Sequence, residues 1–267
     1  MFALPALEHQ GCPVSGGIRR GIVVGVLDHV TIRVSDPAAS AAFYATVLRT
    51  LGVEQTYDGE DLAEWENDFS LAAADADRPV TRGLHIAWFA PTREDVEAFW
   101  QAGIDAGHRD DGAPGPRPQY GPDYYGGFLL DPDGNSAEAV LLDRDRRKGQ
   151  IDHVWIRVAD VAAAKRFYET VAPYGGFRLT DDTPERAQFR FDGGSFSFVA
   201  GRPTEHVHLA FAAADDATVD SFHRAALAAG YRDNGAPGER PEYHAGYYGA
   251  YVLDPDGNNV EVVNHNR

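Results

Sequence analysis

Two histidines and a glutamate on strand-like segments of the C-terminal half are the residues best suited to do chemistry. His153 lies in the segment DHVWIRV, His208 lies in VHLAFAA, and Glu261 stands between two valines near the end of the chain. Burying a carboxylate within an apolar strand costs several kcal/mol unless another group compensates it. A divalent cation held by two imidazoles and this carboxylate would compensate it and would keep coordination positions open for a substrate.

A purely structural interpretation of the same residues is also available. Alternation along the segment places His153 and Arg157 on one face, opposite the apolar residues Val154, Ile156 and Val158. The histidines could then be hydrogen-bonded core residues, and Glu261 could simply pair with Arg157. Each residue taken singly fits this alternative better. The metal hypothesis rests on the whole set and on its recurrence in the chain.

The recurrence is an internal repeat that covers almost the whole sequence. LDHVTIRVSD recurs as IDHVWIRVAD, LHIAWFA recurs as VHLAFAA, and the long GAPG…DPDGN stretch at 112–140 recurs at 235–263. One single-residue gap aligns the two halves. We therefore expect an N-terminal extension, two domains of ordinary size and a polar linker between them. Their bounds are 1–26 for the extension, 27–143 and 151–264 for the domains, and 144–150 for the linker.

Each half reads as strand, helix and three strands, and then the same order again. A helix begins at Asp36-Pro37, which suit the N-cap and first helical positions, and ends at Gly52. The next helix runs from Thr92 to Gly107, and its counterpart from about Asp215 to Gly230. The Asp-Pro-Asp-Gly sequences predict turns between strands. The sequence thus predicts an α+β fold made of βαβββ modules.

Composition excludes several classes of function. A formal net charge of −17 argues against nucleic acid and anionic membrane as partners. Cys12 is the only cysteine, so an intrachain disulfide framework and a cysteine-based metal cluster are excluded, and a reducing cytoplasm is expected. The apolar run at 21–27 is too short to span a bilayer. Small-molecule chemistry is the expectation that remains, and a chain with four modules could act as a monomer or as a homodimer.

The motifs resemble the vicinal-oxygen-chelate superfamily, which includes glyoxalases, bleomycin-resistance proteins and extradiol dioxygenases. The resemblance rests on the DHV strand, the His-hydrophobic-Ala-aromatic strand and the DPDGN-x-x-Glu hairpin, in this order and twice, from residue 27 to 264. It implies that the paired modules of each half curl into a cup-shaped open β-barrel around a divalent metal. Fe(II) is favoured, and Mn(II), Ni(II) or Zn(II) would also suit the ligands. The resemblance places one ligand set in each half: His29, His85 and Glu138 in the first, and His153, His208 and Glu261 in the second.

Two details narrow the chemistry within that superfamily. Glyoxalase I enzymes add a second glutamate ligand on the strand before the second histidine, but the corresponding FSLAAA and FSFVAG segments contain none, which disfavours a lactoylglutathione lyase. The end of the second half resembles the extradiol signature, with His244 and Tyr251 preceding the turn and Glu261, although Ala250 and Glu242 depart from it. In that family such a histidine handles protons and such a tyrosine donates a hydrogen bond to the substrate. The alternatives are a loop histidine and a packed tyrosine, since Phe128 takes the place of Tyr251 in the first half.

Several further residues are candidates for substrate contact. Trp155 replaces Thr31 on the inward face of its strand, beside Arg157, so the two cups are expected to differ in size and hydrophobicity. Tyr247 and Tyr248 lie in a loop rich in Gly, Pro and Tyr that could stack on a planar ligand. That loop could equally well only plug the open side of the barrel.

Three hypotheses of function follow. The first is an extradiol-type dioxygenase with Fe(II) in the second domain, His244 as acid and base, and Tyr251 as positioning donor. The second is a Lewis-acid isomerase, lyase or transferase of the glyoxalase type. The third is a ligand-binding protein of the bleomycin-resistance type, which needs no metal triad. Metal content separates the third from the others, and oxygen consumption with catechols separates the first from the second.

Overall fold

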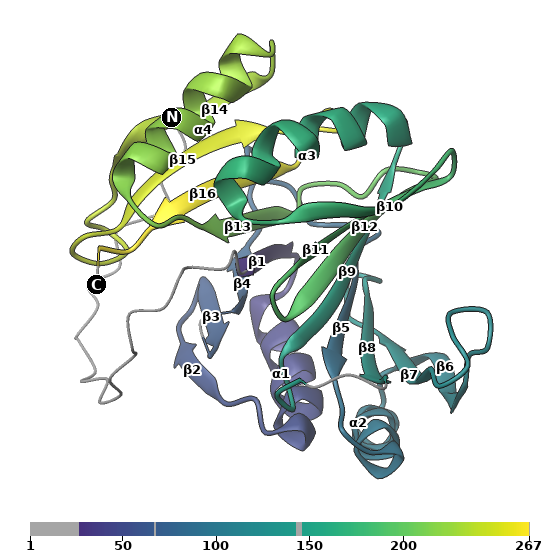
Figure 1. Cartoon of the computed structure of the whole chain (residues 1–267). Helices are drawn as coiled ribbons and strands as arrows, with labels where there is room; N and C mark the ends of the chain where they lie inside the picture. Colours follow the sequence, from purple (N-terminus) through teal and green to yellow (C-terminus); the bar gives the residue numbers. More distant parts are fainter. Residues whose placement is uncertain (1–26, 67, 143–145, 267) are drawn as a thin grey trace.

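The computed structural model describes residues 27–66, 68–142 and 146–266, and it confirms the α+β class and the order of the modules. Four α-helices and a 3-10 turn alternate with sixteen strands (Figure 1). The helices are α1 (Pro37–Leu48), followed by η1 (Arg49–Leu51), α2 (Arg93–Asp105), α3 (Val161–Gly175) and α4 (Asp216–Ala228). The strands of the first half are β1 (Leu27–Val34), β2 (Gln55–Asp58), β3 (Leu62–Trp65), β4 (Phe69–Ala73), β5 (His85–Phe89), β6 (Arg109–Pro116), β7 (Tyr125–Leu130) and β8 (Ser136–Leu141). Those of the second half are β9 (Ile151–Val158), β10 (Arg178–Thr183), β11 (Arg186–Phe191), β12 (Gly194–Ala200), β13 (His208–Ala212), β14 (Arg232–Glu239), β15 (Tyr248–Leu253) and β16 (Asn259–Asn264).

The strands form two eight-stranded mixed sheets, each open at both edges. We call the sheet with strand order β14-β15-β16-β13-β1-β4-β3-β2 the terminal sheet, because it joins the first module of the chain to the last. The other, with order β10-β11-β12-β9-β5-β8-β7-β6, joins the two middle modules and is called the central sheet. Both sheets curve, and neither closes into a barrel (Figure 1).

This pairing corrects the expectation that the two modules of one half share a cup. In the structure, β1 lies antiparallel to β13 of the other half, and β5 lies antiparallel to β9 of the other half. The modules of one half are instead joined through their helices, since α1 packs against α2 and α3 packs against α4. The segments 74–84 and 201–207 carry the chain from one sheet to the other and meet at the Arg82–Glu205 bridge. Each cup therefore contains material from both halves.

The helices begin and end where the sequence predicts. The Asp36 side chain accepts a hydrogen bond from the amide of Ala39, and Pro37 occupies the first turn of α1. Gly52 ends the following 3-10 turn with a φ of 72°, a left-handed conformation that glycine adopts without a steric penalty. The side chain of Thr92 caps α2 in the same way, and that of Asp215 caps α4.

Alternation along the strands decides which side chains face the helices and which face the cup. On β1, Val30, Ile32 and Val34 are fully or almost fully buried, while His29 lies on the other face. Helices α1 and α4 pack on the terminal sheet, and α2 and α3 pack on the central sheet. The apolar core thus lies between helices and sheets, and the opposite face of each sheet is free to carry polar groups.

The two DPDGN turns fasten the strands that carry the candidate ligands. The Asp254 carboxylate accepts a hydrogen bond from the Asn258 amide, and the Asn258 side-chain oxygen accepts one from the amide of Val207. Because Val207 precedes His208 and Asn258 precedes β16, the turn fixes the two strands relative to each other. Asp131 and Asn135 repeat the arrangement in the first half.

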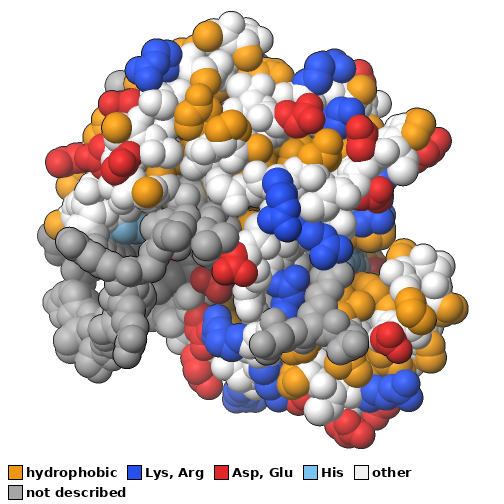
Figure 2. Space-filling model, viewed as in Figure 1, with side chains coloured by type: hydrophobic (Ala, Val, Ile, Leu, Met, Phe, Trp, Pro, Cys, Tyr) orange, Lys and Arg blue, Asp and Glu red, His pale blue; other side chains and the backbone are white. Residues whose placement is uncertain are grey.

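The surface is mixed in character. Acidic, basic and apolar side chains are interspersed on the face shown in Figure 2. Among the described residues, no helix is both long and apolar enough to cross a membrane.

Candidate metal centres

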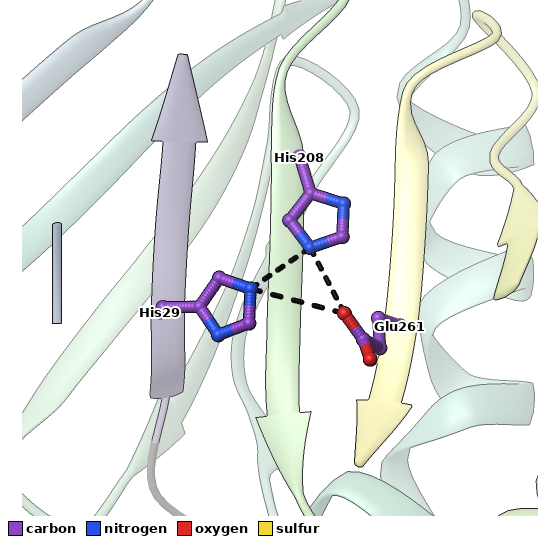
Figure 3. Close-up of side chains that lie close together, drawn as sticks. All are labelled: His29, His208 and Glu261. Carbon is purple, nitrogen blue, oxygen red and sulfur yellow. Dashed lines mark hydrogen bonds and ion pairs between the residues drawn. The ribbon is translucent and has the colours of Figure 1, made fainter. Parts of the chain in front are cut away.

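The first cluster of candidate ligands, here called the terminal centre, lies on three adjacent strands of the terminal sheet. His29 comes from β1, His208 from β13 and Glu261 from β16, and all three side chains point toward one another (Figure 3). Glu261 Oε2 lies 3.1 Å from His208 Nε2 and 3.8 Å from His29 Nε2. The two Nε2 atoms are 3.1 Å apart.

The second cluster, the central centre, repeats this arrangement on the central sheet. It consists of His85 on β5, Glu138 on β8 and His153 on β9. Glu138 Oε2 lies 3.0 Å from His85 Nε2 and 3.4 Å from His153 Nε2. The two imidazole nitrogens are 3.3 Å apart.

All six predicted ligands therefore come together, but not in the sets that the sequence suggested. His29 was expected with His85 and Glu138, and it lies instead with His208 and Glu261. His153 was expected with His208, and it lies instead with His85 and Glu138. The exchange follows from the sheet pairing, because each first-strand histidine joins the module of the opposite half. An active site confined to the second domain is thereby corrected, since each centre takes residues from both halves.

A small residue in the middle strand makes room for each cluster. Ala210 pairs directly with His29 on one side and with Glu261 on the other, and Ala87 pairs in the same way with His153 and Glu138. Both alanines are completely buried. A larger side chain at either position would separate the imidazole from the carboxylate across it.

A tyrosine hydroxyl fixes the outer oxygen of each carboxylate. The Tyr247 hydroxyl donates to Glu261 Oε1 and the Tyr124 hydroxyl donates to Glu138 Oε1, each at 2.7 Å. Oε2 is left facing the imidazoles. Gly249 and Gly126 supply the space, because a Cβ atom at either position would collide with the same Oε1 atom. Tyr247 was predicted to contact substrate; the structure shows this supporting contact with Glu261, and the substrate contact stays a prediction.

An aspartate orients one imidazole in each centre. His29 Nδ1 donates to Asp28 at 2.8 Å, and His153 Nδ1 donates to Asp152 at 2.9 Å. With the proton on Nδ1, the Nε2 lone pair points into the cluster, which is the arrangement that metal-binding histidines use. The same hydrogen bond makes each imidazole a stronger ligand.

The partners behind these aspartates differ between the centres. The second oxygen of Asp28 accepts from His265 Nε2 at 2.8 Å, and His265 Nδ1 lies 2.8 Å from His244 Nε2. The second oxygen of Asp152 instead pairs with Arg146 at 3.0 Å. A chain of imidazoles thus supports the terminal centre, and a permanent positive charge supports the central one.

The charges of the ligands match a site built for a cation. Burial raises the pKa of Glu138, but the contacts with His153 and His85 outweigh burial, so its pKa lies below the usual value. Burial lowers the pKa of His153, but Asp152 and Glu138 raise it to about 9. In the terminal centre, burial lowers the pKa of His208, whereas contact with Asp28 outweighs burial and raises the pKa of His29. Each centre thus holds a buried carboxylate facing two imidazoles, and a metal would replace protons there.

The spacing of the donor atoms fits a divalent ion. Metal–nitrogen and metal–oxygen bonds of about 2.0–2.2 Å place neighbouring ligand atoms roughly 3.0–3.5 Å apart at tetrahedral or octahedral angles. The measured separations of 3.0–3.4 Å in the central centre lie in that range, and only the 3.8 Å separation in the terminal centre exceeds it. Two imidazoles and one carboxylate leave further positions open, which suits catalytic rather than structural sites.

The remaining predicted site residues differ in how closely they approach the candidate metal ligands. Tyr251, on β15, pairs directly with Glu261, and its buried hydroxyl lies close to the Glu261 carboxylate and to Tyr243. His244 contacts His265 and not a candidate ligand. Trp155 faces the central centre, with its ring 6.0 Å from that of His85.

Two predicted contacts are not at a centre. Tyr248 donates to Asp220 of α4, on the helix side of the terminal sheet, because adjacent residues of a strand point to opposite faces. The Arg157 guanidinium donates to the Gly83 carbonyl in the connection between the sheets. The alternative ion pair between Arg157 and Glu261 is not formed, and substrate contact by Tyr248 and Arg157 stays a prediction.

Some supporting residues were missed by sequence reasoning. Asp28 and Asp152 could have been found, since an aspartate precedes the histidine in both copies of the first strand. Tyr124 could have been assigned with Tyr247, because both recur in the repeat. His265 and Arg146 carry no such signal, as they lie outside the repeated motifs.

Replacing Tyr247 with phenylalanine should weaken metal binding at the terminal centre. The substitution removes the donor to Glu261 Oε1, and loss of an outer hydrogen-bond partner typically lowers metal affinity about 10- to 100-fold. Competition with a chromophoric chelator measures the change. Tyr248→Phe is the matched control, since its hydroxyl bonds Asp220. Equal weakening in both variants would contradict the assigned role.

Comparisons with known proteins agree with this architecture. The family described as the Glyoxalase/Bleomycin resistance protein/Dioxygenase superfamily matches residues 26–139 and again 150–262. The structure of glyoxalase I from Zea mays shares 18% sequence identity over 90% of this chain and 92% of that chain, with a TM-score of 0.64. A candidate dioxygenase from Bacillus subtilis subsp. subtilis str. 168 shares 15% identity over 90% of this chain and 85% of that chain, with a TM-score of 0.62. Comparison with curated protein sequences gives no significant match.

Proposed function

Because the chain belongs to the Glyoxalase/Bleomycin resistance protein/Dioxygenase superfamily, we propose that it is an enzyme that holds a divalent metal in each of its two centres. The observation that carries the proposal is the pair of completely or almost completely buried carboxylates, Glu138 and Glu261, each facing two imidazole nitrogens. Such a carboxylate is costly to bury without a cation. The substrate is a small molecule that presents two neighbouring oxygen atoms to the metal.

At the terminal centre, the reaction that fits best is oxygenation of a catechol-like substrate by dioxygen. His29, His208 and Glu261 would hold Fe(II), which supplies Lewis acidity and the redox chemistry that dioxygen requires. Tyr251 favours this centre over the other, because its hydroxyl is buried next to Glu261, whereas Phe128 at the matching position of the central centre has no hydroxyl. Tyr251 would donate a hydrogen bond to a substrate oxygen.

The surrounding residues have supporting roles. Tyr247 and Asp28 hold Glu261 and His29 in place through the contacts described above. His244 acts through His265 and Asp28 on the orientation of His29, since it contacts no ligand itself. The proton-transfer role that the sequence suggested for His244 stays a prediction. Among the described residues around this centre, Tyr251 is the group that we assign to direct contact with the substrate.

A second reaction type is favoured at the central centre by two specific differences. Phe128 occupies the position of Tyr251, with its ring 6.0 Å from that of His85, and Gly121 occupies that of His244. The donor that distinguishes the terminal centre is therefore missing from the residues described here. A Lewis-acid reaction, in which the metal stabilises an enolate or another oxyanion, fits this centre better.

Oxygen consumption by the Fe(II)-loaded protein, prepared without air, tests the assignment. With a panel of catechols, His208→Ala should abolish oxygen uptake and His85→Ala should leave it, because only the first variant damages the terminal centre. Tyr251→Phe should lower kcat about 100-fold, as expected for a donor that stabilises developing charge. Uptake lost in His85→Ala and kept in His208→Ala would move the reaction to the central centre. Failure to take up any metal would leave a ligand-binding protein.

A further inference from the structure

The side chains around the two centres differ although the backbone repeats. On β9, Trp155 pairs with Ser197 of β12, just as Thr31 pairs with Ser70 in the terminal sheet. One strand further along, β11 has Arg186 where the matching position of β3 has Leu62, and Gln188 where β3 has Glu64. Residues at matching positions of the two sheets therefore differ as follows: Thr31 matches Trp155, Leu62 matches Arg186, and Glu64 matches Gln188.

These exchanges give the two centres different surroundings. Beside the terminal centre, the hydroxyls of Thr31 and Ser70 bond each other at 2.7 Å, and the charge of Glu64 acts on His29. Beside the central centre stand a large aromatic ring and a guanidinium. At the terminal centre the charges of Glu64 and Arg33 oppose each other, whereas the additional guanidinium beside the central centre favours an anionic ligand there.

Trp155 links the ligands of the central centre to Arg186. Its ring is half-buried and lies 6.0 Å from the rings of both His85 and His153. Tyr120, which is 49% exposed, contacts the same indole edge-on at 5.5 Å. The Arg186 guanidinium carbon lies 5.4 Å from the indole centre. The indole thus lies beside the candidate metal ligands, and the Arg186 guanidinium covers part of one of its faces.

The Arg186 guanidinium has N–H donors that make only long contacts or none among the described residues. Its contacts are a long 3.4 Å bond to the Ser197 hydroxyl and a loose 3.7 Å approach to Asp181, whose side chain is 45% exposed. Its Nε atom is buried and has no hydrogen-bond partner among the described residues. Arg117 and Arg240, which also stack on aromatic rings, instead each donate at 2.7 Å to a backbone carbonyl. A buried donor left unpaired is costly, so Arg186 is suited to an incoming acceptor.

We propose that the central centre binds a planar ligand that carries an anionic group, and that the terminal centre does not share this preference. The ring of the ligand packs on Trp155, its carboxylate or similar anion accepts from Arg186 in place of Asp181, and its other end reaches the metal. The two centres are therefore sites for different ligands. The inference rests on the proposed function only for the metal at the far end of the ligand.

Binding to the zinc-loaded protein tests this without any turnover. The probes are 3,4-dihydroxybenzoate and its neutral isostere 3,4-dihydroxybenzamide, measured by calorimetry at equal metal content. The acid should bind about 10-fold more tightly or better, as expected for hydrogen bonds to a charged group. Arg186→Gln should remove this preference and Arg186→Lys should restore part of it. Arg157→Gln is the control for loss of a positive charge on β9, the strand that carries Trp155, and it should keep the preference.

Two further variants locate the site and separate this inference from the proposed function. His29→Ala, which damages only the terminal centre, should keep the preference, and His85→Ala should lose it. A preference that survives Arg186→Gln, or that disappears in His29→Ala, would overturn the inference. Zinc content is measured independently, so absence of zinc would contradict the proposed function, whereas bound zinc without an Arg186-dependent preference would contradict only the inference.

Discussion

Removing divalent metal should lower the melting temperature of this protein by about 10 °C or more. An ion that binds only the folded state at a free concentration 1,000-fold above its Kd contributes about 4 kcal/mol. For a chain of this size, each kcal/mol corresponds to roughly 2–4 °C. The chain has two such centres, so their contributions to the free energy of unfolding add. Each centre joins strands of both halves. The effect should be large because the ion offsets the burial of Glu138 and Glu261.

Differential scanning calorimetry with and without a chelator measures this effect. Adding back Mn(II), Fe(II) or Zn(II) should restore the melting temperature in proportion to the metal bound. The double variant His85→Ala/His208→Ala, which damages both centres, provides the control and should not respond. A wild-type melting temperature that is unchanged by metal at saturating concentration would contradict a role for these clusters in binding it.

The second large effect is expected from Glu138→Gln. The substitution keeps the shape of the side chain but removes the negative charge that faces His85 and His153. Metal affinity at the central centre should fall by more than the roughly 100-fold that loss of an outer partner costs, because a direct ligand is lost. The pKa of His153 should also fall in the metal-free protein, since Glu138 helps to raise it to about 9.

Chelator competition and titration by NMR would follow both consequences. Glu261→Gln is the matched variant, and it should weaken only the terminal centre and leave the pKa of His153 unchanged. If Glu138→Gln weakened both centres equally, the two clusters would not be independent sites.

Sequence reasoning predicted the six side chains that form the two clusters, but it could not show how they are grouped. The two copies of the first strand, around His29 and His153, have nearly the same alternation and the same DHV motif. The hydrogen bonds and apolar contacts of these strands can form equally well whether a strand pairs within its own half or with the other half. The choice depends on the connections at 74–84 and 201–207 and on helix packing, which the local pattern does not encode.

Features that depend on local interactions could be predicted from the sequence, whereas those that depend on strand register or on distant residues could not. Helix ends followed from capping residues such as Asp36 and Thr92, because capping is a local interaction. The different roles of Tyr247 and Tyr248 could not be foreseen, since register decides which of two adjacent residues faces the cup. The link from Asp28 through His265 to His244 joins residues far apart in the chain, and no motif reports it.

The central claim is that each metal centre is shared between the halves, and metal stoichiometry in paired histidine variants tests it most directly. If the ligands are grouped as in the structure, His85→Ala/His153→Ala removes two ligands of the central centre only. Elemental analysis should then still find one equivalent of metal, bound at the terminal centre. His29→Ala/His85→Ala damages both centres and should bind none. The opposite result, no metal in the first variant and one equivalent in the second, would show that each centre is confined to one half and would contradict this account.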